Sequence, residues 1–255
     1  MGISVLFTDL DGTLLDAGGR LGPRAAEVVT RLRALGVPVV PVTSKSENEL
    51  RTWLGVLDAG GTGVFENGAG LVTPAGVQVL PAAVPVARLR RILDGAARRR
   101  GLRILPLDRI PDPALAALTG LRGDAIDQAR RRVWDLPFLA PDGSGDALED
   151  EIGRVRNVRL VRGGIFWHLC GRHDKADAVP RVCDLFRRSG RTVGLGDAPN
   201  DARFLAAVDV AVVLPGESGP DARLLAALPG ARVAPAPGGE GWAAAVTALL
   251  EEEAA

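Results

Sequence analysis

The chain has 255 residues, and its 31 basic and 31 acidic side chains cancel to a formal net charge of zero. A balanced charge argues against binding to nucleic acid or to a membrane surface through bulk electrostatics. Hydrophobic residues make up 47% of the chain, the two cysteines are too few for a disulfide framework, and no apolar run reaches the ~20 residues that span a bilayer, so we expect a globular cytoplasmic protein.

The first 80 residues alternate between strand-like and helix-like segments. The apolar pattern predicts strands at 3–8, 37–42 and 63–66 and helices at 21–35 and 47–56. Ser46 precedes the second helix and is expected to cap it. This β-α-β-α-β order with buried strands predicts a parallel, doubly wound α/β sheet with right-handed crossovers.

The middle of the chain has a different character. Seven prolines punctuate residues 79–141, and the pattern predicts helices near 86–100, 122–132 and 146–155 and strands at 157–161 and 165–169. We expect residues 82–170 to form an inserted α+β domain. The α/β alternation then resumes, with helices expected at 175–189, 221–228 and 241–252 and strands at 192–195, 210–214 and 232–234. Residues 1–81 and 171–255 would therefore form one core.

Polar residues follow several of the predicted strands. They are Asp9 and Asp11; Thr43, Ser44 and Lys45; Glu66, Asn67 and Gly68; and Asp197, Asn200 and Asp201. Ligands of open α/β sheets bind outside the carboxyl ends of the strands, so these segments are expected to converge. Two carboxylates two residues apart on a strand face the same side and need a nearby cation, and such oxygen ligands suit Mg²⁺.

Four motifs in this order resemble those of the haloacid dehalogenase superfamily of phosphatases. They are Asp9-Leu-Asp11-Gly-Thr-Leu-Leu, Val-Thr43-Ser-Lys, Asp174-Lys175-Ala and Gly-Asp197-Ala-Pro-Asn200-Asp201. The insertion between the second and third motifs is similar to the C2-type cap domain of that superfamily. Stretches at 65–68, 132–138 and 166–175 further resemble mannosyl-3-phosphoglycerate phosphatases.

The resemblance implies a mechanism for these residues. Asp9 would be the nucleophile that forms an aspartyl-phosphate, and Asp11 would be the general acid and base, which its expected burial would favour. Thr43 and Lys175 would stabilise the transferring group. The resemblance also implies a Mg²⁺ ion, with metal-binding roles at Asp9, the backbone carbonyl of Asp11, Asp197, Asn200 and Asp201.

The resemblance also implies a substrate, mannosyl-3-phosphoglycerate and also its glucosyl analogue, hydrolysed during synthesis of a compatible solute. A phosphorylated glycoside of this kind carries a carboxylate and many hydroxyls. Residues expected to recognise it are Ser44, Lys45, Glu66, Asn67, Gly68, Arg130, Arg132 and His168. Arg130 and Arg132 equally fit a solvated helix face, and His168 equally fits a packed core position.

Other functions remain open from the sequence. A broader sugar-phosphate phosphatase and a phosphomannomutase-like enzyme share the same motifs. A phospho-acceptor signalling module also combines acids, a hydroxyl and a lysine on a parallel sheet, but it lacks a long insertion and needs no second carboxylate at Asp11. The sequence leaves the oligomeric state undecided.

Overall fold

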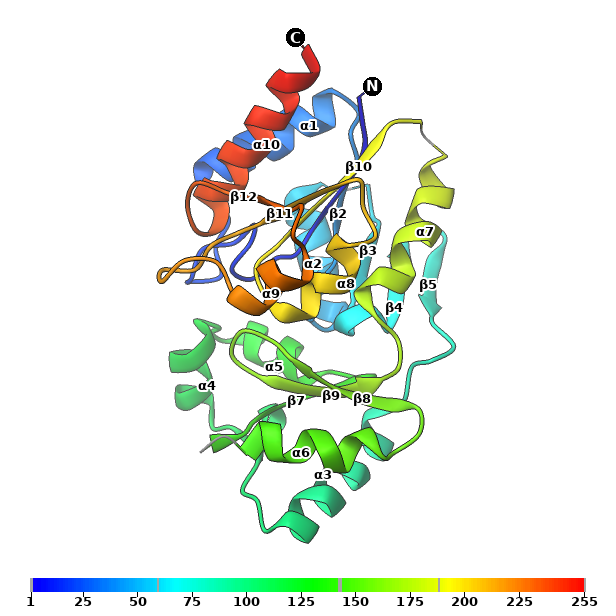
Figure 1. Ribbon diagram of the computed structural model, residues 1–255, viewed down its shortest axis with the longest axis vertical. Helices are drawn as coiled ribbons and strands as arrows, with labels where there is room; N and C mark the ends of the chain where they lie inside the picture. The colour runs from blue at the N-terminus through cyan, green and yellow to red at the C-terminus, as the bar shows by residue number, and fades with distance from the viewer. Residues whose placement is uncertain (1, 59, 142–143, 188, 255) are drawn as a thin grey trace.

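The computed structural model describes residues 2–58, 60–141, 144–187 and 189–254. Its largest sheet has five parallel strands in the order β12-β11-β10-β1-β2 (Figure 1). The strands are β1 (Ile3–Thr8), β2 (Val39–Pro41), β10 (Arg191–Gly196), β11 (Val210–Val213) and β12 (Arg232–Val233). Both β1 and β10, whose carboxyl ends carry the aspartates, are therefore interior strands.

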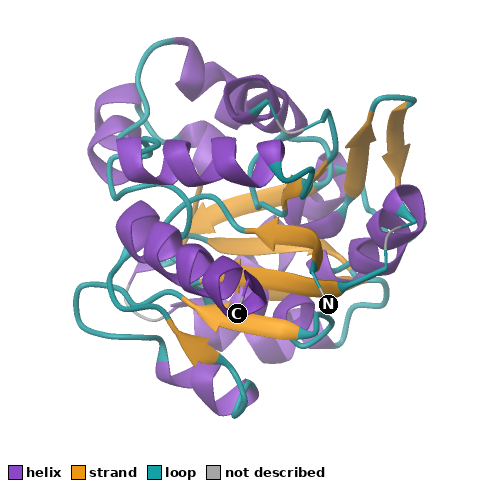
Figure 2. Ribbon diagram, turned by 90° about the horizontal axis from the view of Figure 1, so that it is seen from above, coloured by secondary structure: helices purple, strands orange, loops and turns teal. Residues whose placement is uncertain are grey.

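Helices pack against both faces of this sheet (Figures 1 and 2). They are α1 (Pro23–Ala34), α2 (Glu47–Leu57), α7 (Lys175–Phe186), α8 (Ala202–Leu205), α9 (Ala222–Ala227) and α10 (Gly238–Ala254). Side chains alternate along β1, so Leu6 packs with α1, α2 and α10, whereas Val5 and Phe7 pack with α7, α8 and α9. The predicted doubly wound α/β core is confirmed.

The third predicted strand differs from expectation. Strand β3 (Gly63–Phe65) pairs antiparallel with β4 (Gly70–Thr73), which pairs antiparallel with β5 (Gly76–Val79), and a parallel bridge between Val42 and Val64 joins it to the main sheet. The cause is the backbone at 66–68, where three consecutive residues have positive φ and turn the chain back on itself. A three-stranded antiparallel meander is thus attached to the main sheet where one further parallel strand was expected.

Residues between β5 and α7 build a separate four-stranded antiparallel sheet in the order β6-β7-β9-β8. Its strands are β6 (Leu105–Pro106), β7 (Asp135–Leu139), β8 (Val158–Arg162) and β9 (Trp167–Gly171), and its helices are α3 (Val86–Arg100), α4 (Asp112–Thr119), α5 (Asp124–Arg130) and α6 (Ser144–Gly153). Helices α3 and α6 lie on the side away from the core, and α5 lies toward it (Figure 1). We call this region the cap.

The chain passes between core and cap twice, and the two crossings touch. A Cβ atom at Gly171 would lie 2.0 Å from the carbonyl oxygen of Ala82, so only glycine permits this approach. These crossings support the proposed division into a core of residues 1–81 and 171–255 and a cap of residues 82–170, although β9 extends one residue past that boundary. No helix among the described residues has the length and apolarity to cross a membrane.

Candidate active site

The carboxyl ends of β1 and β10 bring three aspartates together. Asp9 follows β1, Asp197 follows β10, and Asp201 closes the short 3₁₀ helix Pro199–Asp201. One carboxylate oxygen from each lies within 4.8 Å of the others. This is the edge at which ligands of open α/β sheets bind, so the sheet topology itself creates the cluster.

Lys175 is the cation inside this cluster. Its Nζ lies 2.9 Å from Oδ1 of Asp9 and 2.6 Å from Oδ1 of Asp201, and the side chain is fully enclosed. Burial disfavours the ammonium, but the carboxylates of Asp201 and Asp9 outweigh it and hold the pKa of Lys175 above its usual range. Lys175 is the first residue of α7, and Asp174 before it is the N-cap residue of that helix. The hydrogen bonds of this N-cap therefore fix the position of Lys175.

The cluster holds more negative charge than Lys175 can balance. Burial raises the pKa of Asp9 to about 7, with the Asp201 charge adding to the effect. Burial and the charges of Asp201 and Asp9 also raise the pKa of Asp197 well above its ordinary value. Three carboxylates beside one ammonium leave a deficit of positive charge, which a divalent cation would remove.

The donor set around Asp197 fits a hard metal ion. Oδ1 of Asp197 accepts a hydrogen bond from the Thr13 hydroxyl at 2.8 Å, which orients the carboxylate. A Cβ at Gly12 would lie 2.5 Å from Oδ2 of Asp197, so the glycine and its φ of +77° make room for this carboxylate. Within the described residues, Oδ1 of Asn200 is buried and has no hydrogen-bond partner. Carboxylates with a free amide oxygen form the oxygen-rich site that Mg²⁺ prefers.

Asp201 has a different position from the one expected of a metal ligand. Its Oδ1 accepts from Lys175, and its Oδ2 accepts from the backbone N–H groups of Asp197 and Ala198, each at 3.1 Å. Both oxygens are therefore occupied, and the carboxylate orients Lys175 and the 197–198 loop. The geometry therefore favours a role for Asp201 in positioning Lys175 over the metal-binding role that the resemblance implied.

Asp11 is exposed, contrary to the expected burial. Its side chain is 54% accessible, and Oδ2 lies 2.8 Å from Nζ of Lys45. Strand β1 ends at Thr8, so residue 11 lies in the turn that follows the strand, and its side chain no longer alternates with those of β1. Thr43 is buried at the end of β2, and its hydroxyl accepts a hydrogen bond from the backbone N–H of Lys45 at 3.1 Å.

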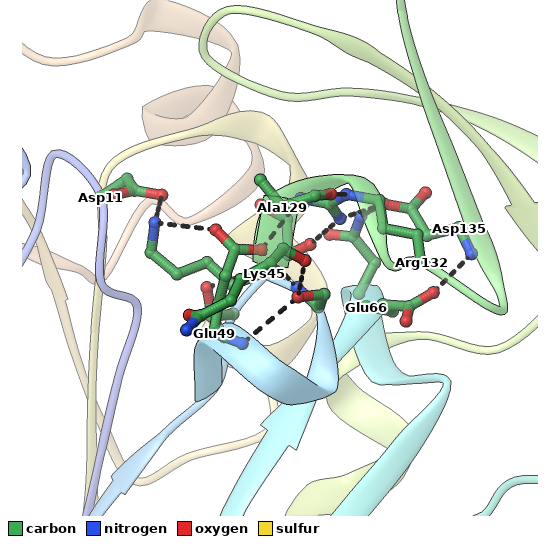
Figure 3. A network of polar contacts seen from close by, with 12 residues as sticks. Asp11, Lys45, Glu49, Glu66, Ala129, Arg132 and Asp135 are labelled. Carbon is green, nitrogen blue, oxygen red and sulfur yellow. Dashed lines mark hydrogen bonds and ion pairs between the residues drawn. The ribbon is translucent and has the colours of Figure 1, made fainter. Parts of the chain in front are cut away.

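Several residues expected to bind substrate join one network between core and cap. In Figure 3, Lys45 and Glu49 from the core approach Arg132 from the cap. Arg132 also donates to the backbone carbonyl of Ser44 and lies 3.2 Å from Asp135, which contacts Nδ1 of His168 at 2.7 Å. The predicted Ser44, Lys45, Arg132 and His168 are thus brought together.

Asn67 and Gly68 connect this network to the aspartate cluster. The Asn67 amide donates to Asp135 at 3.4 Å, and its oxygen accepts from Asn200 at 3.1 Å. At Gly68, with φ of +94°, a Cβ would lie 2.1 Å from the backbone carbonyl oxygen of Asp174, so the backbone packs directly against the start of α7. The 66–68 turn therefore ties the lysine-bearing helix to the cap side of the site.

Glu66 and Arg130 are both engaged by other groups of the protein. Oε2 of Glu66 accepts hydrogen bonds from the backbone N–H groups of Trp134 at 2.6 Å and Asp135 at 2.7 Å. The backbone nitrogen of Val133 lies 3.2 Å from each of the two Glu66 carboxylate oxygens. Burial raises the pKa of Glu66 to about 7. This geometry argues against a role in binding sugar hydroxyls. Arg130 binds Asp112 and the carbonyl of Ile110, so it is engaged within the cap.

Two acids of this network, Glu49 and Asp135, were not among the site residues expected from the sequence. Glu49 was visible only as an acid in the first turn of α2, and Asp135 only within a motif stretch. Both are buried beside Arg132, at distances of 3.6 Å and 3.2 Å. A buried acid at helix position N3 that follows a lysine by four residues can form an ion pair with that lysine as well as cap the helix.

Known proteins resemble this chain in sequence and in fold. Residues 6–99 match the family of haloacid dehalogenase-like hydrolases. A glucosyl-3-phosphoglycerate/mannosyl-3-phosphoglycerate phosphatase of Methanococcoides burtonii is 26% identical, over 81% of this chain and 82% of its own length. A protein of the same name from Persephonella marina is 29% identical, over 83% of this chain and 84% of its own length.

A solved structure supports the same fold. A sugar phosphatase described as haloacid dehalogenase subclass IIB superimposes with a TM-score of 0.73 at 15% identity, covering 98% of this chain and 99% of its own. The family match, the phosphatase relatives and the shared fold agree with the motifs that suggested this superfamily. The chain is a phosphoric monoester hydrolase, and it is similar in sequence and fold to the haloacid dehalogenase superfamily.

Proposed function

We propose that this enzyme is a Mg²⁺-dependent phosphatase that hydrolyses mannosyl-3-phosphoglycerate, and also its glucosyl analogue, to the glycosylglycerate and phosphate. The observation that carries the proposal is the cluster of Asp9, Lys175 and Asp197 at the carboxyl ends of β1 and β10. The substrate comes from the relatives, which are named for both phosphoglycerates. Such a product serves as a compatible solute.

In the first step, a carboxylate oxygen of Asp9 attacks phosphorus as the ester P–O bond breaks. Lys175 holds Oδ1 of Asp9 at 2.9 Å, which orients the nucleophile and offsets charge near the phosphoryl group. Asp11 gives its proton to the departing alcohol oxygen. The exposed position of Asp11 at the entrance of the site suits contact with a leaving group held under the cap.

In the second step, water attacks the phosphorus of the aspartyl-phosphate. Asp11, now a carboxylate, takes the proton from that water, and the P–O bond to Asp9 breaks to release phosphate. The Thr43 hydroxyl, at the end of β2, donates to a phosphoryl oxygen in both steps. The enzyme returns to its starting state with a free Asp9 carboxylate.

Asp9, Asp197 and the backbone carbonyl of Asp11 would hold Mg²⁺, with Asn200 orienting the waters around it. When bound, the ion supplies positive charge that offsets repulsion between the carboxylates and a dianionic phosphate. The free oxygen of Asn200 and the charge deficit at Asp9 and Asp197 support this assignment.

Steady-state kinetics on a panel of phosphate esters tests the substrate. We expect kcat/KM for mannosyl- and glucosyl-3-phosphoglycerate to exceed that for glucose 6-phosphate by ~100-fold or more, because the cap must recognise both a carboxylate and a sugar. Equal turnover of unrelated hexose phosphates would indicate a broader sugar-phosphate phosphatase. A protein-bound acyl-phosphate that persists for minutes would indicate a signalling module.

A further inference from the structure

The acid/base candidate Asp11 lies at the end of a row of alternating charges that reaches into the cap. Lys45 contacts Asp11 at 2.8 Å and Glu49 at 3.7 Å. The other oxygen of Glu49 lies 3.6 Å from Arg132 of the cap, and Arg132 lies 3.2 Å from Asp135. Only the Asp11 end is open to solvent, because the other four side chains are 10% exposed or less.

Glu49 is the central charge of this row. Lys45 and Arg132 are both cations, with side chains that are 8% and 10% exposed, so their like charges repel each other with little screening by solvent. The Glu49 carboxylate lies between them and separates the two. Oε2 of Glu49 also accepts the backbone N–H of Ser46 at 2.8 Å, which fixes the carboxylate to the first turn of α2. A rigid anion thus sets the position of Lys45.

Lys45 in turn sets the position of Asp11. An exposed aspartate with no partner samples several rotamers, whereas a fixed ammonium at 2.8 Å selects one. The buried ammonium of Lys45 contacts the carboxylates of Asp11 and Glu49, and these two anions offset the cost of burying its charge. The lysine therefore needs both acids, and loss of Glu49 would leave it anchored only by a mobile, solvated carboxylate.

We propose that Glu49 is a positioning residue for proton transfer: it fixes Lys45, and through Lys45 the carboxyl group of Asp11, and it links both to Arg132 of the cap. The proposal rests on the proposed function of Asp11 as general acid. It assigns Glu49 no contact with substrate. Its consequence is that proton delivery to the leaving group depends on a residue outside the reacting atoms.

The test compares two leaving groups in the Glu49→Gln variant with Mg²⁺ present. Gln keeps the capping hydrogen bond of α2 but removes the charge. Release of p-nitrophenolate needs little help from an acid, whereas release of the glycerate alkoxide from mannosyl-3-phosphoglycerate needs a proton. We expect the single-turnover rate at saturating substrate to fall ~10-fold or more for the glycoside and less than ~3-fold for p-nitrophenyl phosphate.

Two matched variants complete the experiment. Glu47→Gln changes an acid in the same helix turn that pairs with exposed Arg51, and we expect it to leave both rates unchanged. Asp11→Asn should show the same leaving-group selectivity as Glu49→Gln, only larger. Circular dichroism and the thermal midpoint of each variant report whether it is folded.

The outcomes separate failure of the Glu49 positioning role from failure of the acid/base role of Asp11. Equal losses on both substrates, no loss, or a change confined to KM in Glu49→Gln would overturn the positioning role while leaving the function of Asp11 intact. An Asp11→Asn variant without leaving-group selectivity would overturn the acid/base assignment itself, and the Glu49 proposal with it. Selective loss in both variants, with Glu47→Gln unaffected, supports both.

Discussion

The carboxylate of Asp9 lies between an ammonium and two other carboxylates. This environment gives the Asp9→Asn variant two separate expected results. Turnover should fall by ~10⁴-fold or more, because an amide cannot form the acyl-phosphate. Without Mg²⁺, the thermal midpoint should equal or exceed that of the wild type, since one of three crowded carboxylates loses its charge.

Single-turnover assays with the phosphoglycerate and calorimetry of the metal-free protein measure these two quantities. Activity near that of the wild type would exclude Asp9 as the nucleophile. Loss of activity together with a much lower midpoint would mean that the substitution unfolds the site.

His173 lies at the returning crossing between cap and core and is fully buried. Burial lowers the pKa of His173 below its ordinary value of 6.5. As pH falls through 6.5, the unfolded chain binds a proton that the folded chain does not, so the free energy of unfolding falls by up to ~1.4 kcal/mol per pH unit until the folded pKa is reached. Above pH 6.5, His173 is neutral in both the folded and the unfolded chain, so this loss of stability is absent.

The His173→Gln variant lacks this titration. The difference in unfolding free energy between wild type and variant should therefore shift against the wild type as pH is lowered from 7.5 to 5, as measured by urea denaturation. A difference that is constant over this range would contradict the prediction.

Residue patterns predicted some of these positions and missed others for a physical reason. Asp9 and Asp197 directly follow buried strands and Thr43 lies two residues beyond another, so their gathering at one sheet edge follows from the parallel topology alone. Glu66 also follows a strand, yet its carboxylate binds backbone N–H groups almost 70 residues away. Contacts of that kind depend on how the cap docks, which local sequence does not encode.

Helix α2 links the site to the cap through its first residues. The Ser46 hydroxyl accepts the backbone N–H of Glu49 at 3.3 Å and donates to the backbone carbonyl of Gln128 in α5 at 2.8 Å. Ser46→Ala removes both contacts, and we expect it to lower the free energy of unfolding by ~1–2 kcal/mol. Thr30→Ala on α1, whose exposed hydroxyl only returns to Ala26, should have almost no effect.

Urea denaturation of both variants measures this difference. If Ser46→Ala matched Thr30→Ala, the hydroxyl would contribute neither a helix cap nor a tie between core and cap.

Elements with a strong apolar period were predicted well, and those without one were not. Strand β1, helix α1 and helix α2 follow the expected bounds closely because each buries one face. The four residues of β5 are exposed, so no alternation marked them as a strand. Strand β9 begins at Trp167 rather than 165, because Gly163 forms a turn by donating to the carbonyl of Phe166.

At the scale of the whole molecule, metal binding couples the site to stability. Asp9 and Asp197 come from strands whose pairing joins the two halves of the core sequence, so an ion that binds both stabilises the folded state alone. We expect EDTA to abolish activity and Mg²⁺ to restore it. At a hundredfold excess over Kd, Mg²⁺ should add ~2.7 kcal/mol of stability, which raises the thermal midpoint by several degrees.

The Asp197→Asn variant provides the comparison. Its midpoint should respond weakly to Mg²⁺ in the same scan. An identical upward shift in the variant would show that the ion binds elsewhere on the protein.

The contact between Gly171 and Ala82 has a consequence for the history of such enzymes. The chain leaves the core at Ala82 and returns at Gly171, and these two residues touch. An inserted segment can therefore join the core whenever its two ends lie close together. A different insert can then replace the existing one as a cassette, with the register of β1 against β10 unaltered. The cap, which would select the substrate, and the core, which would cleave the phosphate ester, can accordingly change at independent rates during evolution.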